Sequence, residues 1–179
     1  MSIPYFPGLE PFALSADQMA EVQTSFALVL SDARLTILSK QDIRSAAASV
    51  HSGPGVYFWA MGVGNQNYRI YVGKTKSLAR RVSDYMKDFQ AHSPNDYKIR
   101  VFQQTITDKH PEAQFRLHFV AASLETYSQV ENDWIQRFDP LLNRRASANA
   151  GARDSFRKAF EAYYRAGFEE ILTRPHSAT

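Results

Sequence analysis

Five residues of chemically versatile types recur in a pattern that independent packing roles explain poorly. Tyr57 and Tyr71 lie in two short strand-like runs, and Lys74 follows the second run almost at once. Arg81 and Glu131 lie on the apolar stripes of two predicted helices instead of on their polar faces. A charge removed from water is costly unless it is paired or coordinated. The two charges therefore either pair with each other as a structural feature or belong to a functional site.

The two tyrosines are expected to be neighbours because the runs that carry them read as a hairpin. Val56–Ala60 and Tyr68–Val72 are rich in aromatic and β-branched residues, and Gly62–Asn67 between them is a natural turn segment. Adjacent strands bring both phenols to one face, close to Lys74. Such a gathering of polar groups favours the functional-site interpretation over separate structural roles.

The remaining sequence predicts helices around a small sheet. Capping-box patterns at Ser15–Gln18 and Ser39–Asp42 start two of them, the first with helical spacing that continues to Leu30. Further helices are predicted from Ser77 and over about 95–107, 126–138 and 155–166, and an alternating strand over Gln114–Ala121. The expected fold class is α+β, with a small antiparallel three-stranded β-sheet flanked by helices.

The chain divides into a core and two flanking regions. Residues 1–54 read as an N-terminal helical extension, 55–143 as the core, and 144–179 as a C-terminal helical extension that follows an Ala/Ser/Asn/Gly-rich linker. The two extensions are expected to cover the core, and neither contains a recognisable catalytic motif.

Composition excludes several classes of protein. The 179 residues are 44% hydrophobic and include no cysteine, which excludes disulfide scaffolds, thiolate zinc sites and cysteine nucleophiles. A net charge of +3 permits a nucleic-acid partner without requiring one. No apolar run approaches the length of a membrane span and no basic leader is visible, so the expectation is a cytoplasmic protein without membrane contact. The histidines lack metal-ligand spacing; they are His51, His92, His110, His118 and His176.

The spacing of these motifs resembles that of the GIY-YIG nuclease superfamily, which includes an excision-repair endonuclease, homing endonucleases and type II restriction enzymes. Gly55-Val56-Tyr57 and Tyr71-Val72-Gly73 are similar to the two halves of the family motif. Arg81 lies ten residues beyond Tyr71, as the family's catalytic arginine does, with Arg80 as the neighbouring alternative. Glu131 and Asn143, twelve residues apart, resemble the closing motif. The two tyrosines are a few residues further apart than is usual, and Gly62–Asn67 is expected to absorb the excess as a longer hairpin loop.

The resemblance implies a divalent-metal-dependent DNA endonuclease, with Mg²⁺ (or Mn²⁺) as the cofactor. Glu131 would anchor the metal, and the guanidinium of Arg81 would bind a phosphate oxygen. Tyr57 would act as the general base, with its pKa lowered by Lys74 and the metal. Tyr71 would hold the water or the phosphate. Asn143 would secure the end of the helix that carries the metal ligand.

The partner implied is DNA, contacted by basic and aromatic side chains around the motifs. The candidate DNA-binding residues are Lys76, Arg80, Tyr85, Lys87, Arg144 and Arg145. A small restriction-type enzyme, a structure-specific repair or recombination nuclease and a nuclease toxin all fit the sequence. A catalytically silent nucleic-acid-binding module is the alternative of another class. The sequence leaves open the recognised DNA, the cut pattern and whether the chain is a monomer or a homodimer.

Overall fold

A five-stranded antiparallel sheet forms the centre of the protein. The computed structural model describes residues 9–50, 52–86, 94–143 and 151, and within them the strand order is β1-β4-β3-β5-β2. The strands are β1 (Ala13–Leu14), β2 (Ala27–Leu30), β3 (Gly55–Val63), β4 (Gln66–Thr75) and β5 (Gln114–Ala121). The helices in these ranges are α1 (Ala16–Ser25), α2 (Lys40–Val50), α3 (Leu78–Met86), α4 (Pro94–Lys109) and α5 (Tyr127–Phe138), and a 3₁₀ turn spans Glu10–Phe12. The predicted α+β class is confirmed.

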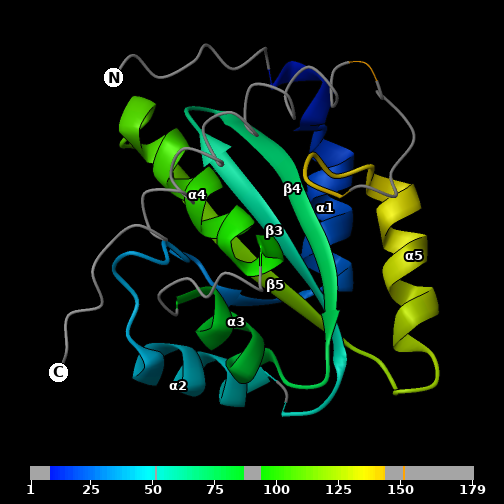
Figure 1. Cartoon of the computed structure of the whole chain (residues 1–179). Helices are drawn as coiled ribbons and strands as arrows, with labels where there is room; N and C mark the ends of the chain where they lie inside the picture. The colour runs from blue at the N-terminus through cyan, green and yellow to red at the C-terminus, as the bar shows by residue number, and fades with distance from the viewer. Residues whose placement is uncertain (1–8, 51, 87–93, 144–150, 152–179) are drawn as a thin grey trace, which may run out of the picture.

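Helices cover both faces of this sheet. α1 and α5 lie on one face, while α2, α3 and α4 lie on the other (Figure 1). The middle strand β3 is buried from Gly55 to Met61, as expected of a strand covered on both sides. Its side chains alternate between two apolar clusters: Tyr57 and Trp59 pack towards α3, whereas Val56 and Phe58 pack towards α1 and α5. The sheet therefore separates two cores, and polar groups on neighbouring rungs face different helices.

The prediction of three strands is wrong, because residues from the N-terminal region add one strand at each edge. β2 pairs with β5, and the two-residue β1 pairs with β4. The helix predicted through Leu30 ends at Ser25, where Phe26 turns to an extended conformation. An apolar run such as Phe26–Leu30 fits a helix or a strand equally well, and the partner β5 decides between them. The capping box at Ser15 and Gln18 is confirmed, with hydrogen bonds of 3.0 and 3.1 Å.

The β3–β4 hairpin is longer than expected, but its turn is tight. The two strands remain paired up to Val63 and Gln66, so the connection is a two-residue turn in which Gly64 adopts a positive φ of 56°. The register shifts between Trp59 and Ala60, which marks a β-bulge. The extra residues between the motif tyrosines therefore lengthen the strands and not the loop, contrary to the prediction. They lie at the end of the hairpin opposite Tyr57.

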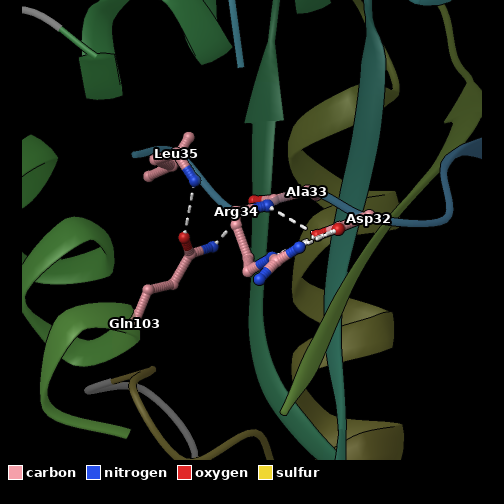
Figure 2. Close-up of polar contacts among 5 residues, drawn as sticks. All are labelled: Asp32, Ala33, Arg34, Leu35 and Gln103. Atoms are coloured by element: carbon pink, nitrogen blue, oxygen red, sulfur yellow. Dashed lines mark hydrogen bonds and ion pairs between the residues drawn. The ribbon is translucent and has the colours of Figure 1, made fainter. Parts of the chain in front are cut away.

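The connection between β2 and α2 is held by a side chain from α4. Gln103 is buried, accepts a hydrogen bond from the Leu35 amide at 2.9 Å and donates one to the Ala33 carbonyl at 3.0 Å. Figure 2 shows the Gln103 side chain beside the backbone of Ala33 and Leu35, next to the ion pair between Asp32 and Arg34. Satisfying these buried backbone groups fixes the path of the chain from the sheet edge to α2.

His118 is a buried polar residue in the centre of β5. It is 2% exposed, lies opposite Phe58 of β3, and within the described part of the chain neither ring nitrogen has a hydrogen-bond partner. Burial, assisted by the charge of Arg116, lowers the pKa of His118 to about 4. The ring is therefore neutral in the folded protein at neutral pH.

This burial predicts a specific loss of stability in mild acid. Below its unfolded pKa of 6.5 the unfolded chain binds a proton at His118 that the folded chain accepts only near pH 4. The free energy of unfolding should therefore fall between pH 6.5 and 4, by at most about 3 kcal/mol from this residue. Urea unfolding of the protein and of His118→Leu across this range measures the effect. Parallel pH curves for the two proteins would contradict it.

Several predicted features lie outside the described residues, among them the linker near 146–152, except residue 151, and the helix over 155–166. The described helices include none that is long and apolar enough to cross a membrane. The division into 1–54, 55–143 and 144–179 stays a prediction, although residues before 55 complete both edges of the sheet.

Candidate active site

Three polar side chains meet between α3 and the sheet: Tyr57 of β3, and Arg81 and Tyr85 of α3. The hydroxyl of Tyr57 lies 2.7 Å from the hydroxyl of Tyr85, and Arg81 Nε donates a hydrogen bond to the Tyr57 oxygen at 3.2 Å. The Arg81 guanidinium also lies over the Tyr85 ring, 4.7 Å from its centroid. Tyr71 flanks this group, with its ring centroid 6.2 Å from that of Tyr57. A phenol in contact with a guanidinium is an arrangement suited to acid–base chemistry at a phosphate.

Local sequence explains how these groups meet. Arg81 and Tyr85 are four residues apart on α3, so they share one helix face. The helix begins directly after β4, where the Thr75 hydroxyl accepts a hydrogen bond from the Ser77 amide at 3.1 Å. On the sheet, Tyr57 lies opposite Gly73. A methyl group on Gly73 would overlap the Tyr57 hydroxyl and the Tyr71 ring, so the second motif glycine provides the space for both phenols.

Replacement of Gly73 by alanine should therefore damage the site more than the fold. We expect Gly73→Ala to push Tyr57 away from Arg81 and to lower any activity that depends on this contact by roughly 10- to 100-fold. The melting temperature and the activity of the variant are to be compared with those of Gly62→Ala, which lies on the same hairpin far from Tyr57, where a methyl group has more room. An unchanged activity in a folded Gly73→Ala protein would contradict the assignment.

The environment of Tyr57 has opposing effects on its pKa. Burial, at 1% exposure, raises the pKa of the phenol, whereas the charge of Arg81 and the hydrogen bonds from Tyr85 and Arg81 lower it. Burial dominates, so Tyr57 is protonated at neutral pH. The expectation that Lys74 lowers this pKa is wrong, because Lys74 points to the opposite face of the sheet and the cation beside the phenol is Arg81.

A second polar group lies on the face that α5 covers. Lys74 Nζ is 3.0 Å from Glu131 Oε2 and donates a hydrogen bond to Ser128 Oγ at 3.0 Å. The ammonium also lies 5.5 Å from the centroid of the Tyr127 ring. Because Glu131 pairs with Lys74, the simple alternative in which Arg81 and Glu131 form a structural ion pair is wrong. Sequence reasoning missed Ser128 and Tyr127, although their positions one turn before Glu131 place them on the same helix face.

The two groups occupy consecutive rungs at one end of the β3–β4 hairpin. Tyr57 pairs with Gly73, and the next rung pairs Val56 with Lys74. The negative charge of Glu131 contributes to raising the pKa of Tyr57, so the two faces interact electrostatically at this end of the sheet.

Asn143 fastens the closing motif to the edge of β4. Its side-chain oxygen accepts a hydrogen bond from the Val72 amide at 2.9 Å, and its side-chain nitrogen donates one to the Val72 carbonyl at 2.8 Å. Leu141 and Leu142 donate their amides to the Arg69 and Ile70 carbonyls just before it. The side chain of Asn143 thus takes the place of a strand partner at Val72, between Tyr71 and Gly73.

The donor set around Glu131 is compatible with Mg²⁺ bound through one carboxylate. The described residues contain no group of three or more His, Cys, Asp and Glu side chains that could hold a metal. Mg²⁺ keeps several waters and is commonly bound by one or two carboxylates together with substrate phosphates. Glu131, whose side chain is 12% exposed, offers one such carboxylate.

The candidate DNA-binding residues fall into three groups. Lys76 and Arg80 are exposed beside the site, as expected of residues that contact a backbone. Tyr85 is buried and hydrogen-bonded to Tyr57, so the structure places it in the packing between α3 and the sheet. Lys87, Arg144 and Arg145 lie outside the described residues.

Fold, motif order and site geometry together define a GIY-YIG nuclease domain. The model of the UvrC-like GIY-YIG domain matches residues 53–144, which is about half of the chain, and the chain belongs to this family. It is 37% identical to UvrABC system protein C of Corynebacterium aurimucosum over 101 residues, or 56% of this chain and 13% of that protein. The corresponding protein of Mycolicibacterium vanbaalenii is 34% identical over 102 residues, 57% of this chain and 13% of that protein. That of Bifidobacterium longum is 30% identical over 105 residues, 59% of this chain and 12% of that protein. No solved structure was found that matches the chain.

Proposed function

We propose that this chain is a divalent-metal-dependent DNA endonuclease that hydrolyses phosphodiester bonds. The observation that carries the proposal is a pair of contacts at one end of the β3–β4 hairpin. Arg81 donates a hydrogen bond to Tyr57, and Lys74 forms an ion pair with Glu131. The domain that contains them belongs to a nuclease family. A silent binding module would not need to keep a buried phenol, a guanidinium and a carboxylate in this arrangement.

Each residue has a role that follows from its contacts. Arg81 binds the scissile phosphate through its planar guanidinium and stabilises the charge that develops there. Tyr57 accepts the proton of the attacking water as general base. Burial raises the pKa of Tyr57, and the charge of Arg81 together with the hydrogen bonds from Arg81 and Tyr85 partly offsets this effect. Tyr71, which is less buried than Tyr57, holds the water or the phosphate in line.

The metal fits the second face of the site. A divalent cation bound by Glu131 would neutralise charge on the phosphate and on the leaving oxygen. Asn143 keeps Tyr71 and Gly73 in register with this face by holding the backbone of Val72. Lys76 and Arg80 supply salt-dependent contacts to the DNA backbone without reading its sequence.

A role in DNA repair agrees best with the proteins that the chain resembles. Those relatives are named as proteins of the UvrABC system, yet this chain spans only about an eighth of their length. Their complete activity and their partners therefore do not follow for this chain. A structure-specific nuclease is accordingly our first candidate, and a small restriction-type enzyme is the second.

A substrate panel tests the proposal and separates these candidates. Purified protein with Mg²⁺ is incubated with plasmid, branched duplexes and single-stranded DNA. Cleavage at branch points supports the structure-specific nuclease, and discrete plasmid fragments support the restriction-type enzyme. DNA that is bound but not cut in any form would overturn the proposal and favour the binding module.

A further inference from the structure

We propose that the ion pair between Lys74 and Glu131 blocks the metal-binding carboxylate in the metal-free protein, so that Lys74 competes with the divalent cation for Glu131. This inference rests on the proposed function, and it adds a regulatory step to the same site. Its consequence is that Glu131 binds the metal weakly in the absence of DNA and more tightly when DNA is bound.

Among the described residues, one turn of α5 supplies the polar and ring contacts that hold the Lys74 ammonium in place. Lys74 Nζ lies 3.0 Å from Glu131 Oε2, 3.0 Å from Ser128 Oγ and 5.5 Å from the Tyr127 ring centroid. The ion pair is partly buried, with side-chain exposures of 31% for Lys74 and 12% for Glu131. The carboxylate is thus already neutralised within the protein.

The same carboxylate oxygen cannot serve the ammonium and a divalent cation equally well. Mg²⁺ coordinates oxygen at about 2.0–2.1 Å, and a cation there would lie within a few ångströms of Lys74 Nζ and repel it. The ammonium also lies beside the first turn of α5, where the helix dipole disfavours positive charge. Without Glu131 as its partner, Lys74 is driven towards another anion.

The nearest anion in a working complex is the phosphate of the DNA. Lys74 then moves from Glu131 to the phosphate, and this exchange couples the binding of metal to the binding of substrate. In the absence of DNA the pair between Lys74 and Glu131 keeps the metal affinity low.

Metal binding without DNA tests the competition directly. The unbound Mn²⁺ signal in electron paramagnetic resonance gives the affinity of the metal-free protein and of Lys74→Met, which keeps the length of the side chain and removes its charge. We expect Lys74→Met to bind Mn²⁺ roughly tenfold more tightly, because the competing ion pair is lost. Lys40→Met, which removes an exposed lysine on α2, controls for net charge. Ser128→Ala loosens Lys74 without removing it and should raise the affinity by a smaller factor.

Glu131→Gln separates this inference from the proposed function. Weaker Mn²⁺ binding by Glu131→Gln, with tighter binding by Lys74→Met, supports both. If Glu131→Gln weakens binding while Lys74→Met leaves it unchanged or weaker, the competition is overturned and the metal site stands. If Glu131→Gln does not weaken binding, Glu131 is not the ligand, and both proposals are overturned.

Discussion

Glu131→Gln is expected to lower the rate of DNA cleavage by about 10³-fold or more while the protein remains folded. Glutamine keeps the shape of the side chain and retains an oxygen that can accept a hydrogen bond from Lys74. It removes the negative charge that a divalent cation requires. Single-turnover cleavage of a labelled duplex measures the loss.

Two controls accompany this prediction: the stability of Glu131→Gln, and the activity of a variant that neutralises a different carboxylate. The ion pair with Lys74 is partly exposed, so its loss should cost no more than about 1 kcal/mol of unfolding free energy. Glu125→Gln neutralises an exposed carboxylate just before α5 and should cleave at the wild-type rate. Full Mg²⁺-dependent activity in Glu131→Gln would remove this residue from the mechanism.

Arg81→Lys should lower the cleavage rate by roughly 10²–10³-fold although it keeps the positive charge. The planar guanidinium contacts the Tyr57 oxygen through Nε and lies over the Tyr85 ring, and an ammonium reproduces neither geometry. The loss should appear mainly in the maximal rate and less in DNA affinity, because the exposed Lys76 and Arg80, which we propose as contacts to the DNA backbone, are unchanged.

Arg44→Lys is the matched control for this substitution, since Arg44 is exposed on α2. Its rate should equal that of the wild type. A wild-type rate in Arg81→Lys itself would show that a positive charge alone suffices, which would contradict the role assigned to the guanidinium.

Much of the site could be predicted from the sequence because its geometry is local. A hairpin places Tyr57 and Tyr71 on neighbouring strands, and helical spacing places Arg81 and Tyr85 on one face of α3. These relations depend on a few consecutive residues. They therefore hold whatever surrounds them.

Lys74 lies close in sequence to the motif tyrosines, but strand alternation places its side chain on the opposite face of the sheet from Tyr57 and Tyr71. Gly73 faces Tyr57, so its neighbour Lys74 must face α5. Its partner Glu131 lies 57 residues further along the chain, and only the packing of α5 brings the two together. Tyr85 lies on the apolar face of α3 together with Leu78 and Val82, and its burial there follows from helical spacing.

The edge strands were missed for a related reason. β1 has two residues and β2 has four, and neither carries an alternating pattern of its own. Each becomes a strand because it pairs with a longer neighbour, β4 or β5. Pairing of this kind depends on tertiary context that local sequence does not contain.

Incubation of supercoiled plasmid with the wild-type protein in Mg²⁺, and in parallel in EDTA, tests the central claim most directly. The account predicts nicked or linear products in Mg²⁺ and intact supercoiled DNA in EDTA. Equal cleavage in both would contradict the metal-dependent mechanism, and no cleavage of plasmid, branched or single-stranded DNA would contradict the assignment as a nuclease.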